Sequence, residues 1–416
     1  MCARVAAKSG RAGFASSLVG EQSRGGIGGR DATEPAMVQQ VNGDRGESLT
    51  QAQTQRPAGR CTAGMLLVAA VLGGEIFGAS ALAQPTNFPS PPNGTLSRSQ
   101  GIDFVTIGQP GNAPWAGNGT LGDRAIGRGR VDYEYRIGRF EVTTAQWVEF
   151  MNAAYDRPAN DQIPFMQLPG AWGAVGTEPT VTNARRWRVP AGNEMRPVGN
   201  ISWRMAAIYC NWLHNDKALT RDAFLTGAYN VSTFGYTGPN GDQFTDQAAR
   251  SPGARYFIPT WDEWLKATHF DPNRFGQGQP GWWSFANMRE TVTPIGLPPP
   301  FGTGEANAGS GSAGIPLGSY VNIMSPWGLY DTAGGMTEWT ESIFFRSTLD
   351  NRRIFDGSAY DTSTLSDIIS FPEGDFPSFA LGNYGFRIAA AIPGPSTGMI
   401  AGGLMLCAAR RRRVTP

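Results

Sequence analysis

The sequence predicts an α+β domain with much irregular structure, flanked by a tail at each end. Its 416 residues include 55 Gly and 30 Pro but only 17% charged residues, a composition that favours one loop-rich domain. The 12 Trp and 22 Phe supply enough large apolar side chains for a core. Short segments with strand-like alternation precede short segments with helical periodicity, which favours a mixed fold.

The N-terminal region is expected to be a leader. Residues 1–64 have almost no aromatic side chains, so we expect them to be disordered. The alternative is a non-translated leader, with Met37 as the real start. An apolar run and a small-residue stretch ending in Ala83 follow, which is typical of a signal peptide over residues 65–83. The alternative, a buried core helix, is disfavoured by two glycines and Glu75 within the run. Residues 84–100 are expected to be a linker.

The domain itself is expected to cover residues 101–391 and to begin with two strands and a helix. Alternation predicts strands within residues 101–107 and 131–142. Thr143 and Gln146 have the spacing of a capping box, and apolar residues at helical spacing follow them. The sequence therefore predicts that a short amphipathic helix begins at this point.

Two further helices are predicted from their caps. Ser202 precedes an amphipathic run that contains Cys210, and Thr260 with Glu263 forms a second capping box. Asp262 and Glu263 are adjacent carboxylates, which is one arrangement of a catalytic acid pair. We interpret them instead as first-turn carboxylates, which the helix dipole favours.

Charge and cysteine content narrow the classes of function. The net charge of +1 provides no overall field for nucleic acid, so no nucleic-acid partner is predicted. Cys2, Cys61 and Cys407 lie in the predicted tails and leave Cys210 alone in the domain, so no internal disulfide is predicted. Cys210 is expected to be a small buried apolar residue.

The stretch from Ser325 to Ser342 concentrates aromatic residues, glycines and carboxylates. Gly334 and Gly335 allow a tight turn, with Asp331 on one side and Glu338 on the other. Two carboxylates and several carbonyls that converge on one point would suit a hard cation such as calcium. The alternative is that Asp331 caps the turn and Glu338 pairs with an arginine.

The C-terminal residues 392–416 have the order of a sorting tail. A Pro-Gly-Pro break precedes an apolar run, shorter than the roughly 20 residues that span a bilayer, and four arginines end it. This order resembles the PEP-CTERM tail, with Gly394 where that family has glutamate. The resemblance implies export, a membrane contact through the tail and processing by exosortase-type sorting machinery. The alternative is a tail that packs on the domain.

The central stretch also resembles a known enzyme family. Gly328-Leu-Tyr-Asp331 and Gly334-Gly-Met-Thr-Glu-Trp339 are similar to the "GLYDM" and "GNVWEW" signature of the formylglycine-generating enzyme, or sulfatase-modifying factor, family. Further similar blocks lie at residues 137–152, 196–213, 256–267, 353–360 and 384–389. The resemblance implies a loop-rich α+β fold related to C-type lectins.

The resemblance also implies calcium as a cofactor. Its ligands would be the side chains of Asp331 and Glu338 and the carbonyls of Gly334 and Met336. A second calcium would lie beside Asn307 and the Ala308 carbonyl. The family usually has asparagine at the position of Gly335, and its absence here is expected to loosen the turn. Arg387 is expected to be the partner of a carboxylate.

The chemistry of the family is not expected in this chain. Its aerobic members oxidise a substrate cysteine with a pair of cysteines that hold copper(I), placed between the last two blocks. The interval from Gly357 to Arg387 contains no cysteine, so copper is not expected. Two histidines are also too few for the three-histidine iron site of related sulfoxide synthases.

These inferences lead to one hypothesis and one alternative, with a purely structural domain as a third possibility. The hypothesis is an exported, envelope-anchored protein without catalytic residues that acts as a binding or matrix domain. Its ligand would be a polysaccharide or a peptide, bound in the groove that its relatives use for substrate. The alternative is a divergent oxidase that modifies a cysteine of a secreted, sulfatase-like protein.

Overall fold

The computed structural model describes residues 87–120, 122–176, 186–237, 243–309, 312–344 and 352–392. All of them belong to one of two compact units of the chain, Ile76–Pro416. The predicted leader, the signal peptide, three of the four cysteines and nearly all of the sorting tail lie outside the described residues. Within the described ranges, no helix is both long and apolar enough to cross a membrane.

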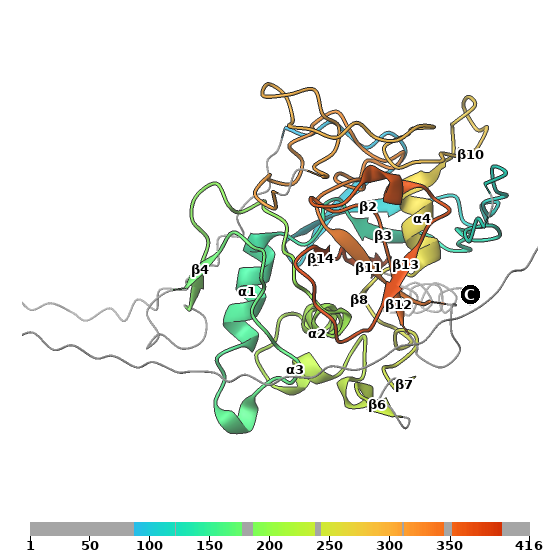
Figure 1. Ribbon diagram of the computed structural model, residues 1–416. Helices are drawn as coiled ribbons and strands as arrows, with labels where there is room; N and C mark the ends of the chain where they lie inside the picture. Colours follow the sequence, from blue (N-terminus) through green and yellow to red (C-terminus); the bar gives the residue numbers. More distant parts are fainter. Residues whose placement is uncertain are drawn as a thin grey trace, which may run out of the picture. The chain divides into compact units, whose positions relative to one another are not determined.

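A five-stranded antiparallel sheet joins strands from both ends of the domain. Its order is β1 (Leu96–Ser99), β2 (Ile102–Ile107), β3 (Tyr135–Gly138), β15 (Ala389–Ala391) and β8 (Tyr256–Phe257), and β2, β3 and β8 of this sheet are labelled in Figure 1. Gln100 and Gly101 join β1 to β2 with φ of 52° and 78°, the backbone of a tight hairpin turn. The strand β1 lies inside the predicted linker 84–100, so the fold begins earlier than expected. Only Tyr135–Gly138 of the predicted strand region 131–142 pairs as a strand, because the residues before it form a loop.

A second, four-stranded sheet carries the central stretch. Its order is β13 (Glu373–Asp375), β12 (Arg353–Asp356), β11 (Thr337–Ile343) and β14 (Tyr384–Gly385). The strands pair antiparallel except β11 and β14, which run parallel. The remaining strands form the short pairs β4 (Val175–Gly176) with β5 (Trp187–Arg188), β6 (Tyr236–Thr237) with β7 (Gln243–Phe244), and β9 (Phe270–Asp271) with β10 (Gly281–Trp282).

The three predicted helices are confirmed at their caps. Thr143 and Gln146 form a reciprocal capping box at α1 (Thr144–Ala154), and Thr260 and Glu263 form another at α4 (Trp261–His269). The Ser202 side chain accepts a hydrogen bond from a backbone N–H at the start of α2 (Trp203–His214). A further short helix, α3 (Asp222–Leu225), and the 3₁₀ turns η1 (Ala159–Asp161), η2 (Val231–Thr233) and η3 (Thr364–Asp367) complete the set.

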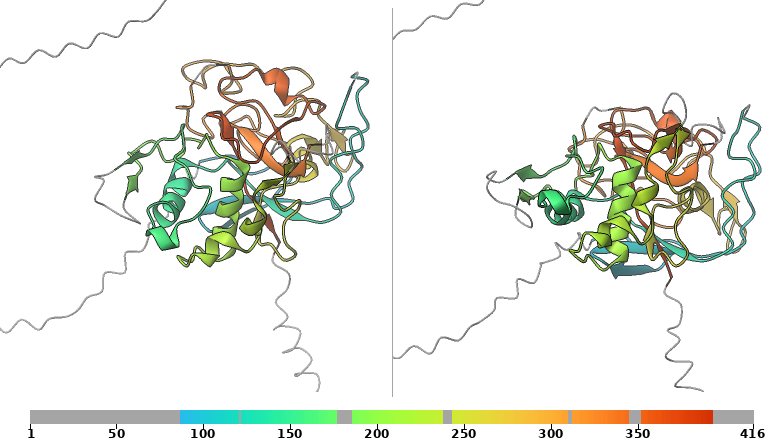
Figure 2. Two further views of the ribbon diagram at one scale, coloured as in Figure 1. Left: turned by 60° about the horizontal axis from the view of Figure 1, so that its bottom comes forward. Right: turned by 90° about the horizontal axis from the view of Figure 1, so that it is seen from below.

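The core is strongly aromatic. Helices α1 and α2 lie side by side (Figures 1 and 2), with the rings of Trp147 and Tyr209 5.4 Å apart. Cys210 lies on α2 and is fully buried there. A second cluster gathers around α4 and includes Trp264 and Trp327. The α+β architecture with short helices and mainly antiparallel strands matches the predicted fold class.

Candidate functional site

Glu338 of the central stretch is bound by Arg387. The Arg387 Nε atom lies 3.1 Å from Glu338 Oε1 and 2.8 Å from Oε2, and its Nη2 atom lies 2.5 Å from Oε1. The indole Nε1 of Trp264 on α4 donates to Oε2 at 2.9 Å. A carboxylate has about four acceptor positions, and these three N–H donors occupy most of them. Of the two interpretations of Glu338, this geometry favours the arginine partner.

The rest of the Arg387 guanidinium points at backbone oxygens. Its Nη1 atom donates to the carbonyls of Gly138 and Arg139 at 3.1 and 3.2 Å, and Nη2 donates to Tyr330 O at 3.1 Å. Burial opposes the arginine charge, but Glu338 outweighs this effect, and the pKa of Arg387 is raised. A permanent cation therefore lies among the oxygens of the central stretch.

Asp331 meets the Arg387 cation through its backbone carbonyl, which accepts from Nη2 at 3.5 Å, while its carboxylate binds another loop. Its Oδ2 atom accepts a hydrogen bond from Gly318 N at 2.7 Å, so it fixes a neighbouring loop. Its own φ is 54°, a left-handed conformation that aspartate tolerates better than most residues. Burial raises the pKa of this carboxyl group to about 6. The Asp331 side chain therefore ties the central stretch to the loop at Gly318, whereas the alternative interpretation placed it as the cap of the glycine turn.

The glycine turn is shaped by Glu141, a residue that sequence inspection missed. Glu141 Oε1 accepts from Met336 N at 3.1 Å, and a Cβ added to Gly335 would lie 2.3 Å from the same oxygen. Oε2 is buried without a hydrogen-bond partner among the described residues. Burial, then the nearby Glu338, raises the pKa of Glu141 well above its ordinary value. The available signal was a carboxylate flanked by apolar Phe140 and Val142.

The two predicted calcium segments do come together, but through their backbones. Asn307 and Gly334 form a parallel bridge, and Gly335 N donates to the Asn307 carbonyl at 3.0 Å. The Asn307 side chain donates its Nδ2 to Ser312 O at 3.1 Å. Ala308 is buried in a small alanine cluster beside the turn. Backbone hydrogen bonding therefore joins the segment at Asn307 to the glycine turn.

The donor set of the central stretch does not fit a calcium ion in this arrangement. Both oxygens of Glu338, the predicted carboxylate ligand, are bonded by Arg387, and one of them also by Trp264. Asp331 binds a backbone N–H of another loop. In the part of the chain that the structure describes, no group of three His, Cys, Asp or Glu side chains is arranged to hold a metal. The cation that the carboxylate of Glu338 binds here is the guanidinium of Arg387.

A groove opens on the other face of the same sheet, at its β12 and β13 end. Its outer part has a volume of about 740 Å³ and its inner part about 160 Å³, and the two share Phe355, Phe371, Glu373 and Tyr384. The outer part is also lined by Arg124, Phe344, Arg352, Pro372, Gly374 and Asp375. The inner part adds Thr337, Asp356, Gly357, Thr362, Ser366, Leu381 and Asn383.

Strand alternation turns the carboxylates of Glu338 and Asp356 toward α4, although Asp356 is among the residues that line the inner part of the groove. Trp339 pairs with Phe355, and Phe355 with Glu373, so these side chains share the groove face. Asp356 is one residue on, and its side chain accepts from Trp261 Nε1 of α4 at 2.6 Å on the opposite face. Asp356 and Glu373 therefore do not face each other across a cleft as a pair of hydrolytic carboxylates must.

The family model described as "Sulfatase-modifying factor enzyme 1-like domain" matches residues 109–392. This chain belongs to that family. Three solved structures resemble it: CarF (22% identical, TM-score 0.43, 70% of this chain and 99% of that one), variable protein 1 of Treponema denticola (18%, 0.42, 72% and 100%) and PvdO from Pseudomonas aeruginosa (12%, 0.38, 73% and 100%). No curated protein matches the chain. The family explains the C-type-lectin-like fold.

The cysteine pair that the resemblance implies for the aerobic members of the family has no counterpart in this groove. None of the residues that line either part of the groove is a cysteine. Cys210 is buried in the core on α2, where burial raises the pKa of its thiol well above the ordinary value. Thiolate ligands for copper(I) are therefore missing from the described groove.

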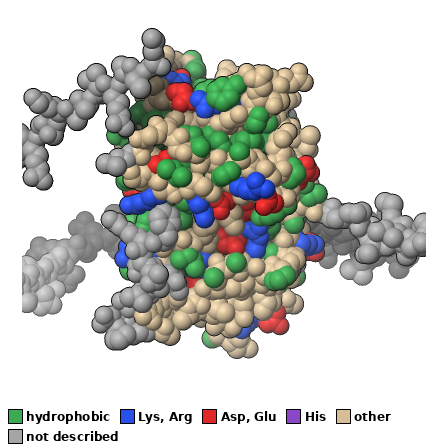
Figure 3. Space-filling view, turned by 90° about the vertical axis from the view of Figure 1, so that its right-hand side faces the viewer, with side chains coloured by type: hydrophobic (Ala, Val, Ile, Leu, Met, Phe, Trp, Pro, Cys, Tyr) green, Lys and Arg blue, Asp and Glu red, His purple; other side chains and the backbone are tan. Residues whose placement is uncertain are grey.

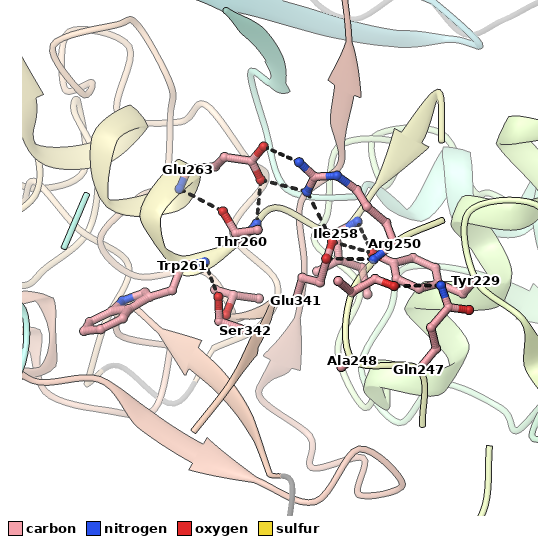
Figure 4. A network of polar contacts seen from close by, with 12 residues as sticks. Tyr229, Gln247, Ala248, Arg250, Ile258, Thr260, Trp261, Glu263, Glu341 and Ser342 are labelled. Carbon is pink, nitrogen blue, oxygen red and sulfur yellow. Dashed lines mark hydrogen bonds and ion pairs between the residues drawn. The ribbon is translucent and has the colours of Figure 1, made fainter. Parts of the chain in front are cut away.

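The carboxylates in the first turn of α4, Asp262 and Glu263, form ion pairs within the domain, and Glu263 also caps the helix. Figure 4 shows the Arg250 side chain between the carboxylates of Glu263 and Glu341. The Arg250 nitrogens lie 2.8 Å from Glu263 and 3.2 Å from Glu341. Asp262 instead pairs with Arg128 at 3.0 Å. The neighbouring carboxylates therefore bind different partners and do not act as an acid pair.

Proposed function

We propose that this chain is an exported, envelope-anchored member of its family that binds a ligand and does not oxidise it. The proposal rests on one observation: the domain has a groove, and none of its lining residues is a cysteine. The family reaction needs two thiols that bind copper(I), and hydroxyl or carboxylate groups do not hold that soft ion. A groove of this volume is within the range of small-ligand sites.

The location of the protein is proposed from its tails. A signal peptide at residues 65–83 and a sorting tail at 392–416 would bring the domain to the cell envelope or outside the cell. The exosortase-type machinery would be the partner of the tail, and the membrane contact would be made through its apolar run. The ligand would be a polysaccharide or a peptide bound in the groove.

Charge gives no support for a nucleic-acid partner. On the face shown in Figure 3, Lys and Arg side chains lie beside Asp and Glu side chains, with hydrophobic groups above and below them. The formal net charge of the chain is +1. Nucleic-acid sites are instead marked by clustered positive charge.

Mass spectrometry tests the absence of oxidase activity. The full chain is incubated with a cysteine-containing sulfatase peptide, with and without copper(I), and the mass of the peptide is followed. We expect the peptide mass to remain unchanged under both conditions. Conversion of the cysteine to the aldehyde would establish the alternative, a divergent oxidase, which membership of the family favours.

A further inference from the structure

The outer part of the groove combines positive and negative side chains in equal number. Arg124 and Arg352 contribute two cations, and Glu373 and Asp375 contribute two carboxylates. A ligand with charges of one sign would meet attraction and repulsion in the same site. The balance instead favours an uncharged ligand that can both donate and accept hydrogen bonds.

Two of these four charged groups are available to a ligand. Among the described residues, neither Arg124 nor Glu373 has an ion pair or a side-chain hydrogen bond, and Glu373 is exposed. The Arg124 guanidinium lies 5.7 Å from the Phe344 ring centre, which orients it over the groove. The other two are held: Arg352 stacks on Phe376 at 4.4 Å, and Asp375 accepts from Tyr384 Oη at 3.0 Å.

Aromatic rings supply the apolar part of the site. Phe371 is 51% exposed and contributes to both parts of the groove. The Phe344 ring packs so closely on β13 that a Cβ added to Gly374 would lie 2.5 Å from it. Sugar rings have apolar faces that pack on such surfaces, while their hydroxyls bond to the neighbouring charged groups.

The edge of the sheet argues against a peptide as the ligand. An extended peptide would add to the free edge of β13, where its backbone could pair. The strand has only three residues, Glu373–Asp375, and lies between Pro372 and Pro377. Proline cannot donate a backbone hydrogen bond, so this edge is too short to hold an extended chain.

We propose that the groove binds a neutral oligosaccharide, with Phe371 as its packing surface and with Arg124 and Glu373 bonding to hydroxyl groups. This inference rests on the proposed binding function and names its ligand class. The inner part adds Ser366 and Asn383, which are further polar groups for a sugar unit.

Calorimetry with defined probes tests the inference. The full chain is titrated with neutral hexasaccharides of glucose, mannose and galactose, with an acidic uronic-acid hexasaccharide and with a library of extended peptides. We expect at least one neutral hexasaccharide to bind. Phe371→Ala, Arg124→Gln and Glu373→Gln should each weaken that binding by about tenfold or more.

Matched controls separate the groove from the rest of the surface. Phe301→Ala removes a ring that is 82% exposed elsewhere, and Arg98→Gln removes an arginine paired with Asp103 in the β1–β2 hairpin. Neither should change the affinity. Equal binding by the groove variants, binding of the acidic probe or the peptides alone, or no binding of any neutral probe would overturn the inference.

These outcomes are distinct from failure of the proposed function. Binding of an unmodified peptide would refute the saccharide ligand but leave the binding function in place. Conversion of a cysteine to an aldehyde would refute the function, whatever the sugar titrations give.

Discussion

At the scale of single residues, Arg387 is the cation around which the central stretch is arranged. It is fully buried and bonds to both oxygens of Glu338 and to four backbone carbonyls. A buried ion pair of this kind costs much to desolvate, so its members depend on each other. Removing one member leaves the other as an uncompensated buried charge.

We expect Arg387→Gln to lower the free energy of unfolding by about 3–5 kcal/mol, because Glu338 would be left unpaired. Chemical denaturation measures the loss. The double variant Arg387→Gln with Glu338→Gln should recover part of it. Arg98→Gln, which breaks an exposed pair, should cost about 1 kcal/mol or less. A loss at Arg387 as small as this control would contradict the prediction.

The buried carboxyl group of Asp367 is expected to make the free energy of unfolding depend on pH. It is 1% exposed, and burial raises its pKa to about 7. A raised carboxyl pKa means that the folded state binds the proton more tightly, so its contribution to stability is present below pH 3.8 and is lost as the pH rises through 7. Asp367→Asn should therefore gain up to about 4 kcal/mol relative to the native chain between pH 4 and 8. The prediction would be contradicted if the difference in free energy of unfolding between the two proteins stayed constant from pH 4 to pH 8.

At the scale of elements, the glycine turn before β11 is matched to one distant side chain. Gly335 has a φ of 78°, and the carboxylate of Glu141 occupies the space where its Cβ would lie. The turn therefore requires glycine for two reasons, its backbone conformation and its close contact with Glu141. The same contact holds Met336 at the start of the strand that carries Glu338.

Comparing Gly335→Ala with Gly253→Ala separates the cost of the backbone conformation from the cost of the contact with Glu141. Gly253 has a similar φ of 80°, but a Cβ added there would meet no atom within 4 Å, so it reports the backbone cost alone, about 1 kcal/mol or more. We expect Gly335→Ala to cost clearly more, by about 1–3 kcal/mol, in thermal or chemical unfolding. Equal losses at the two positions would show that Glu141 moves aside without cost.

At the scale of the whole molecule, the four-stranded sheet β13-β12-β11-β14 has one face that packs on α4 and one face that borders the groove. Glu338 and Asp356 face α4 and bind buried donors, whereas Phe355 and Glu373 lie on the groove face. On the first face, Glu338 has Arg387 as its cation, and Asp356 accepts hydrogen bonds from Trp261 Nε1 and Gly357 N. The second face keeps two charged groups, Arg124 and Glu373, for a ligand.

We therefore expect the melting temperature of the full chain to be unchanged by calcium or by a chelator. A ligand that binds only the folded state would raise the stability in proportion to its concentration, so differential scanning calorimetry is a direct test. A calcium-dependent rise that Glu338→Gln abolishes would contradict this and support the predicted calcium site.

The sequence by itself determined the family, the starts of the three main helices and the lack of thiols between Gly357 and Arg387. Caps such as those at Thr143 and Thr260 are satisfied within one helical turn, so local spacing is enough to predict them. Only the tertiary structure decided which cation Glu338 holds and which acid supports the glycine turn. Arg387 is 49 residues from Glu338, and Glu141 is 195 residues from Met336. Such pairs depend on the register of distant strands and on burial, which no local pattern records.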